Sequence, residues 1–539
     1  MHSYDTLLLN GSLHDGSGSP AEAMDIALRD GRIAAMTARG GLAAASAPDV
    51  VDLAGLAVCP GFVDLHTHSD FTLVVDGRAQ SQVHQGVTTE VIGQCGISCA
   101  PLARSGERTD IMAGHPADAT RGRQWTSFGD YLDVLADSPL GVNVAAFVGH
   151  GTVHRAVLGD ALHAGEVEDV ARMKRLVEEA LDDGAAGLSS GLEYWPGMLA
   201  SPDHLVPLCT AAAARGRPYA SHVRNRDRHY DLGFAEAISA ARQSGARLQI
   251  SHMQTKHGAP AYAGEHTLEM IDAARRHGVD IAFDVIPHDW NNTSVISILP
   301  KWVREGGTRA TLARLASPEV RQKVKDNPAP MLLIVRDRLW DRIVLLNACA
   351  NRDSIGMSFA EIGRHRGVDP WDAAMDMLIE EADDAPRLMW ATHSFSEPQI
   401  ELFLREAACA VISDTAALAP DGPLKEQLFS LSGYGWAARF LQHYVRDRKV
   451  LSLAEAIRRI TSLPASRIGL TDRGVLREGW CADITVFDPE AIESRFSPRT
   501  PRAYPTGIAH VLVNGRFAMR DGLRTHVNAG EVLREFRDR

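Results

Sequence analysis

Two histidines, His66 and His68, stand one residue apart at the end of the apolar stretch 62–65. In an extended strand, alternate side chains point to the same face, so both imidazoles would project toward one point. Neutral imidazole nitrogen binds zinc at about 2.0–2.1 Å. The pair indicates a metal site. The alternative is that they are simply two histidines on a polar strand end. Further ligands elsewhere in the chain would favour the metal site.

Four more residues with metal-binding or acid–base chemistry follow apolar strands. Cys95 lies between two glycines in Gly93-Gln94-Cys95-Gly96. His222 and His252 end the similar segments Ala-Ser-His and Ile-Ser-His, 30 residues apart, and Asp414 follows Val-Ile-Ser. A cysteine thiolate binds zinc at about 2.3 Å and can bridge two ions. Each histidine alone could be a hydrogen-bonded loop residue, but the set together favours a metal site. The context of Cys99 favours packing instead.

The middle of the chain alternates apolar strands with helical stretches. Helical periodicity is clear over 167–181 and 267–277. Apolar strands are expected at 144–148, 187–190, 218–221, 248–251, 281–285, 388–392 and 410–413. Such alternation is typical of a parallel sheet.

A closed (β/α)8 barrel explains this region better than an open sheet. Every informative polar residue stands at the C-terminal end of a strand, where barrel active sites form. A doubly wound fold would show a glycine-rich phosphate loop after its first strand, and none is present. We therefore expect an α/β, TIM-like barrel over 59–470. Residues 307–370 fit the pattern least well and predict an insertion, or a cap over the site.

The sequence at both ends of the chain predicts short strands separated by turns. Strands are expected at 4–9, 24–28, 32–36, 482–487 and 508–513, with Asn-Gly or Asp-Gly turns between several of them. Because chain termini often lie close together, 1–58 and 471–539 are expected to form one small β-sandwich. Two independent β domains are the alternative.

Composition bounds the remaining possibilities. The chain has 539 residues, 45% of them hydrophobic, and a formal net charge of −12, which argues against a nucleic-acid partner. No run of 18 apolar residues predicts a membrane span, and the N-terminus lacks the pattern of a signal peptide. Seven scattered cysteines fit a reducing cytoplasm. The oligomeric state is left open.

Several motifs resemble those of a known family. Segment 60–70, Pro-Gly-Phe-Val-Asp-Leu-His-Thr-His-Ser-Asp, resembles the first-strand motif of the amidohydrolase superfamily of metal-dependent hydrolases. Further segments are similar to the N-acyl-D-amino-acid deacylase (D-aminoacylase) family. They lie at 93–101, 149–152, 191–197, 221–224, 250–252, 412–414, 461–470 and 473–484. The resemblance spans nearly the full length and implies a barrel flanked by a β-sandwich built from both termini.

The resemblance also implies a set of metal ligands. A tight zinc site and a second, weaker site would share Cys95, which takes the bridging role, with Glu193 as the alternative bridge. The ligands would be Cys95, His222 and His252 for the tight site, and His66, His68 and Cys95 for the weaker one.

Asp414 matches the catalytic aspartate of this family. It would take a proton from metal-activated water and return it to the leaving nitrogen. The implied reaction is hydrolysis of a non-peptide amide bond in a small molecule, an N-acyl-D-amino acid or a related N-acyl compound.

Substrate recognition departs from the family pattern. The family usually follows its aspartate with a His-Pro-Arg-like segment whose arginine binds the substrate carboxylate, and 415–422 contains none. The residues considered for substrate binding are Tyr194, His150, Arg224, Lys256 and His288. The missing arginine favours, as an alternative, a dihydropyrimidinase- or hydantoinase-like hydrolase of cyclic amides, or another amide or ester hydrolase without a need for an α-carboxylate. Two other classes are less favoured. A non-catalytic metal-binding scaffold would be expected to have lost some ligands, and all six candidates are present. A nucleobase deaminase of the same superfamily would have no role for Cys95.

Overall fold

The computed structural model describes residues 2–103, 119–120, 122–159, 161, 163–328 and 333–536. Its centre is an eight-stranded parallel sheet in the order β16-β12-β11-β10-β9-β8-β7-β6. The first and last strands meet through the Thr67–Thr415 bridge, which closes the barrel. Its strands are β6 (Phe62–Asp64), β7 (Val87–Ile92), β8 (Asn143–Gly149), β9 (Gly187–Gly191), β10 (Tyr219–His222), β11 (Leu248–Ile250), β12 (Ile281–Val285) and β16 (Cys409–Val411). The predicted barrel is confirmed.

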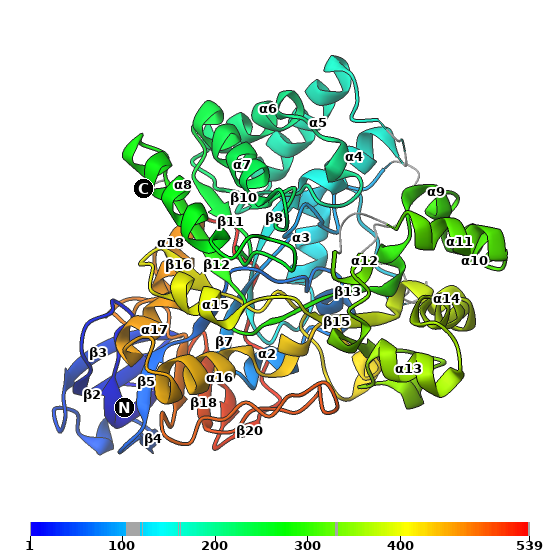
Figure 1. The fold of residues 1–539 in the computed structure, drawn as a ribbon. Helices are drawn as coiled ribbons and strands as arrows, with labels where there is room; N and C mark the ends of the chain where they lie inside the picture. The colour runs from blue at the N-terminus through cyan, green and yellow to red at the C-terminus, as the bar shows by residue number, and fades with distance from the viewer. Residues whose placement is uncertain are drawn as a thin grey trace.

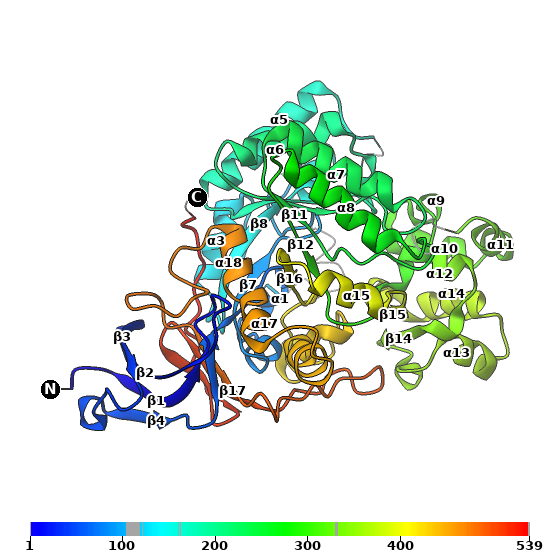
Figure 2. The same cartoon turned by 60° about the vertical axis from the view of Figure 1, so that its left-hand side comes forward.

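Helices cover the outside of the barrel, with α5 to α8 along one side (Figures 1 and 2). Helix α5 packs on the barrel through one apolar face, because Met173, Val177 and Leu181 recur on that face and are buried against the barrel core. The outer helices include α3 (Phe128–Ala136), α4 (His150–Leu158), α5 (Val167–Asp182), α6 (Pro202–Ala213), α7 (Tyr230–Ser244), α8 (Ala263–Arg276), α15 (Glu397–Leu404), α17 (Leu453–Arg459) and α18 (Ser462–Ile468). The helices expected at 167–181 and 267–277 correspond to α5 and α8.

Strands from both ends of the chain form one nine-stranded sheet beside the barrel (Figure 2). Strand β5 joins the two ends, because it pairs in parallel with β1 and antiparallel with β17. The β unit predicted from both termini is confirmed, and the alternative of two independent β domains is wrong. The strands are β1 (Thr6–Leu13), β2 (Glu22–Arg29), β3 (Arg32–Ala38), β4 (Asp49–Asp52), β5 (Ala57–Pro60), β17 (Ile484–Phe487), β18 (Ile508–Val513), β19 (Arg516–Arg520) and β20 (Leu523–Arg524).

The chain between β12 and β16 forms a separate subdomain on one side of the barrel (Figure 1). We call this subdomain, residues 290–393, the cap. It has a three-stranded antiparallel sheet and its own hydrophobic core, which includes Trp340, Trp371 and Trp390. Its strands and longer helices are β13 (Trp290–Ser294), β14 (Ile343–Asn347), β15 (Met389–His393), α10 (Gly307–Leu315), α11 (Pro318–Asp326), α13 (Phe359–Arg366) and α14 (Pro370–Glu381). The insertion expected at 307–370 falls within the cap, apart from 329–332, which lie outside the described residues.

The strand expected in the barrel at 388–392 belongs to the cap. Strand β15 pairs with β13 and β14, and Trp390 packs in the cap core. An apolar run of five residues fits any buried strand, so its sheet could not be assigned from local sequence.

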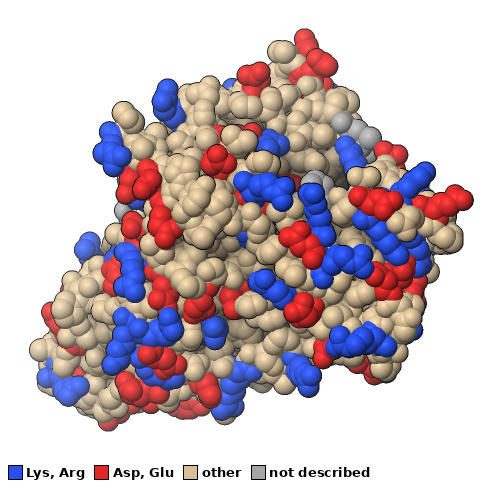
Figure 3. Space-filling model, in the orientation of Figure 1, with Lys and Arg blue, Asp and Glu red and all other residues tan. Residues whose placement is uncertain are grey.

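The surface carries charges of both signs. Figure 3 shows Lys and Arg side chains intermixed with Asp and Glu over one face of the molecule. Within the part of the chain that the structure describes, no helix is long and apolar enough to cross a membrane.

Candidate metal centre

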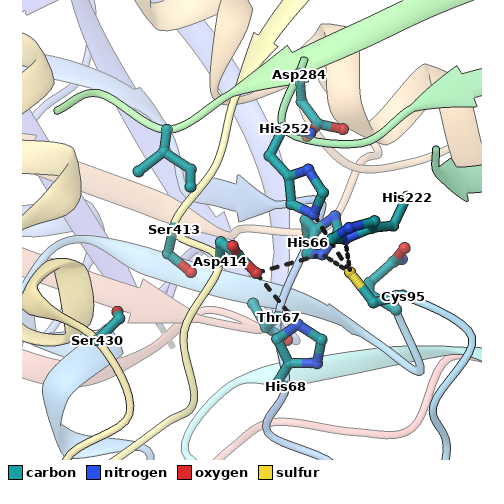
Figure 4. Close-up of polar contacts among 12 residues, drawn as sticks. His66, Thr67, His68, Cys95, His222, His252, Asp284, Ser413, Asp414 and Ser430 are labelled. Carbon is teal, nitrogen blue, oxygen red and sulfur yellow. Dashed lines mark hydrogen bonds and ion pairs between the residues drawn. The ribbon is translucent and has the colours of Figure 1, made fainter. Parts of the chain in front are cut away.

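Cys95 stands at the centre of a group of histidines at the mouth of the barrel (Figure 4). Its Sγ atom lies 3.2 Å from Nε2 of His66, 3.5 Å from Nδ1 of His222 and 3.4 Å from Nε2 of His252. These residues come from the ends of four strands and are buried. The structure thus brings Cys95 together with a side chain 157 positions away in the chain.

Asp414 lies on the other side of the two first-strand histidines. Its Oδ1 atom is 3.2 Å from Nε2 of His68 and 3.5 Å from Nε2 of His66. Two groups of potential ligand atoms result, with Cys95 in both. One comprises Cys95, His222 and His252, and the other comprises His66, His68, Cys95 and Asp414.

The donor atoms fit zinc. In a tetrahedral site with zinc–ligand bonds of about 2.0–2.3 Å, neighbouring ligand atoms are roughly 3.3–3.7 Å apart. The three histidine nitrogens lie 3.2–3.5 Å from Cys95 Sγ, close to this spacing, and all the ligand atoms of each group lie within 4.8 Å of one another. Thiolate, imidazole and carboxylate are ligand types that zinc accepts. The residues present can therefore hold one ion in each group.

Local backbone geometry aims three of these side chains. Cys95, His252 and Asp414 all have positive φ, at 55°, 32° and 50°. Residues other than glycine adopt this conformation at a cost, and such positions concentrate at functional sites. Gly93 makes the Cys95 turn possible, because a Cβ atom there would lie 1.9 Å from the Phe147 carbonyl oxygen.

Two buried carboxylates orient the ligand-bearing segments. Asp284 on β12 accepts a hydrogen bond from the backbone N–H of His252 at 2.6 Å. Asp64 on β6 accepts one from the backbone N–H of Ser413 at 3.1 Å, next to Asp414. Neither residue was expected from the sequence to act at this site, although a carboxylate inside an apolar strand was a usable signal.

The charges around the site favour the ionised forms of the Cys95 thiol and the Asp414 carboxyl group. Burial would raise the pKa of the Cys95 thiol, but His66, His252 and His222 hold it well below its ordinary value. Burial would likewise raise the pKa of Asp414, but His68 and the neighbouring imidazoles lower it. Burial lowers the pKa of His68, yet Asp414 and Cys95 raise it to about 10, so a proton competes with any ion at that nitrogen.

Comparison with known proteins places this centre in a family. A family model described as "Amidohydrolase family" matches residues 49–289 and 414–519, and the gap coincides with the cap and the elements that follow it. The chain belongs to the amidohydrolase family. It is 31% identical to a D-aminoacylase of Alcaligenes xylosoxydans xylosoxydans, over 98% of this chain and 97% of the relative.

Two solved structures can be superposed on this chain over nearly its whole length. An N-acyl-D-glutamate deacylase from Bordetella bronchiseptica, complexed with zinc and a phosphonate inhibitor, superposes with a TM-score of 0.81 at 28% identity. A D-aminoacylase described as having a binuclear metal centre gives a TM-score of 0.80 at 28% identity. Each alignment covers 99% of this chain and 100% of the other. This amidohydrolase is thus similar to D-aminoacylases in sequence and fold.

A cavity of about 1380 Å³ connects the metal centre of this amidohydrolase with the cap. At the barrel end it is lined by Cys95, His222 and Asp414, and at the cap end by Asn291, Lys301 and other residues. The cavity is large enough for a small-molecule substrate. The cap therefore forms one wall of the candidate active site.

The five residues considered for substrate binding separate into two sets. Tyr194, Arg224 and Lys256 line the cavity. His150 and His288 are buried and are absent from the cavity lining formed by the described residues. Burial lowers the pKa of His150 to about 3 and that of His288 to about 4, so both side chains are neutral.

The three residues that line the cavity are already engaged. The Tyr194 hydroxyl donates to the Cys95 carbonyl at 2.6 Å, and Arg224 donates to Glu236 at 2.8 Å. Lys256 donates to Glu193 at 2.5 Å. Glu193, the alternative bridging ligand, instead lies beside His222, with Oε2 2.8 Å from Nε2.

Proposed function

We propose that this protein is a zinc-dependent hydrolase of a non-peptide amide C–N bond, which deacylates an N-acyl-D-amino acid or a related N-acyl compound. The observation that carries the proposal is the pair of ligand groups that share Cys95 and open onto one cavity with Asp414. The relatives named a D-aminoacylase and an N-acyl-D-glutamate deacylase support the substrate class.

Zinc would be held tightly by Cys95, His222 and His252. A second, weaker ion would be held by His66, His68 and Cys95, next to Asp414. The 3.2 Å contact between Nε2 of His68 and Oδ1 of Asp414 supports the weaker affinity, because an ion at this nitrogen would have to displace it. When bound, zinc supplies a Lewis acid for the amide carbonyl and lowers the pKa of water.

Asp414 is the proposed general base and acid. Its pKa is held below the ordinary value, so it is ionised at neutral pH and can accept a proton from the attacking water. While the weaker site holds no ion, Nε2 of His68 and Nε2 of His66 contact the carboxylate through Oδ1, which leaves Oδ2 for the proton. The same oxygen would then deliver the proton to the leaving nitrogen.

Hydrolysis of a cyclic amide or imide, or of an amide or ester without an α-carboxylate, is the second candidate function. It is favoured by the pairing of two cations that line the cavity, Arg224 with Glu236 and Lys256 with Glu193. A substrate carboxylate would have to compete with these carboxylate partners. Such competition weakens recognition of a charged group.

A substrate screen on the zinc-loaded protein tests both candidates. The panel comprises N-acetyl-D-amino acids, their L enantiomers, N-acetyl amines without a carboxylate, hydantoins and dihydropyrimidines, with products resolved by chiral chromatography. We expect release of free D-amino acid at a higher kcat/KM than for every other class. Turnover of hydantoins or neutral amides in preference would support the second candidate. No turnover of any class would contradict both.

A further inference from the structure

His222 presents a different nitrogen from the other histidines near Cys95. His66 and His252 face Sγ with Nε2, whereas His222 faces it with Nδ1. A neutral imidazole that offers one nitrogen as a ligand carries its proton on the other. His222 must therefore carry its proton on Nε2, and that N–H group requires an acceptor.

Glu193 supplies the acceptor. Its Oε2 atom lies 2.8 Å from Nε2 of His222, and its side chain is only 5% exposed. Glu193 follows β9, and the backbone N–H of Leu192 donates to the His222 carbonyl at 3.0 Å, so the two segments are fixed to each other. By contrast, Nδ1 of His252 has no hydrogen-bond partner among the described residues.

Lys256 makes a buried carboxylate possible at this position. Burying a carboxylate alone costs several kcal/mol, and a close, buried cation offsets this cost. Nζ of Lys256 lies 2.5 Å from the same Oε2 atom, and its side chain is 6% exposed. The backbone N–H of Lys256 donates to the Arg226 carbonyl at 2.7 Å, while the Arg226 guanidinium donates to the His252 carbonyl. The loop that bears Lys256, which directly follows His252, is thus fixed to the segment that carries His222.

We propose that Glu193, held by Lys256, is a positioning residue that fixes the His222 ring with its Nδ1 lone pair toward Cys95 and so sets the affinity of the cysteine-centred metal site. This inference rests on the zinc site of the proposed function. It assigns to the pair a role in holding metal, separate from substrate binding. Partners of this kind raise metal affinity by about 10- to 100-fold.

The test measures zinc affinity by competition with a chromophoric chelator, together with the visible absorption spectrum of the Co²⁺-substituted protein. For Glu193→Ala we expect zinc affinity of the tight site to fall by about 10- to 100-fold, with altered Co²⁺ bands. Glu193→Gln keeps a hydrogen-bond acceptor without the charge and should restore part of the loss. Glu397→Gln is the matched control, since Glu397 pairs with Nε2 of His443 at 2.5 Å outside the metal groups, and it should bind zinc normally.

A double variant separates positioning from folding. Glu193→Ala leaves Lys256 as an unpaired buried cation, so this single change can unfold the protein. Adding Lys256→Met removes that cation, and the double variant should fold and still show the fall in zinc affinity expected for Glu193→Ala, because Lys256 acts through Glu193.

The outcomes distinguish this inference from the proposed function. Wild-type zinc affinity and an unchanged Co²⁺ spectrum in folded Glu193→Ala and in the double variant would overturn the positioning role alone. A wild-type protein that binds no zinc would overturn the proposed function and this inference together.

Discussion

Oδ1 of Asp414 lies 3.2 Å from Nε2 of His68, although the two residues are 346 positions apart in the chain. The contact is made where the first and last barrel strands meet, because the backbone N–H of His68 also donates to the Thr415 carbonyl at 2.7 Å. Closure of the barrel therefore places the proposed base beside the first-strand histidines.

Replacing Asp414 with asparagine should abolish most turnover and leave the tight zinc ion in place. The change removes the proton acceptor, and loss of general base catalysis typically costs about 10²- to 10⁴-fold in kcat. The cysteine-centred ligands do not include this residue. Steady-state kinetics measures the loss of turnover, and elemental analysis measures the retained zinc. Asp421→Asn, at an exposed position nearby, is the control, and normal kcat in Asp414→Asn would refute the assignment.

Replacing Cys95 with alanine should remove metal from both sites. Cys95 contributes to each ligand group, so its loss leaves two nitrogen ligands in one and a weaker set in the other. We expect less than one zinc per chain after dialysis, measured by elemental analysis. Cys209→Ala changes a buried cysteine on α6 that is outside both groups and should retain the wild-type zinc content. Full zinc content in Cys95→Ala would show that another residue is the bridging ligand.

Replacing His68 with asparagine should affect the second site alone. His68 belongs to the group that contains Asp414, while the tight trio remains complete. The variant should keep one zinc per chain and lose the additional uptake that the wild-type protein shows at high zinc concentration. Equilibrium dialysis measures both stages. Loss of the tight ion in this variant would contradict the division into two sites.

Replacing Glu90 with glutamine should make stability less dependent on pH between pH 6 and 8. Burial and the neighbouring Asp64 raise the pKa of Glu90 to about 8, so the folded protein keeps it protonated at pH 7 while the unfolded chain does not. Unfolding then releases a proton, and stability falls as pH rises from the unfolded value toward 8. Between pH 6 and 8 the loss would be about 2–3 kcal/mol for this group, at 1.36 kcal/mol per unit.

Urea unfolding midpoints at pH 6 and pH 9 check this expectation. The wild-type midpoint should fall more than that of Glu90→Gln over this interval. Glu168→Gln, at an exposed position on α5, should follow the wild-type protein. Parallel changes in all three proteins would mean that Glu90 is ionised in the fold.

The sequence by itself determined the barrel, the β unit from both termini and the candidate ligands. Strand–helix alternation and the placement of His66, Cys95, His222 and His252 at strand ends are local patterns, and a parallel barrel brings such ends to one face. The same local patterns could not assign 388–392, because a short buried strand has the same composition in a barrel and in a cap.

Only the tertiary structure decided how these residues are connected. That Glu193 contacts His222 and Lys256 depends on pairings across 29 and 63 positions. The same is true of the separation of Tyr194, Arg224 and Lys256, which line the cavity, from the buried His150 and His288. The physical reason is that sequence periodicity fixes which face a side chain occupies, whereas its partner is set by how distant segments pack, and one chain carries no local record of that packing.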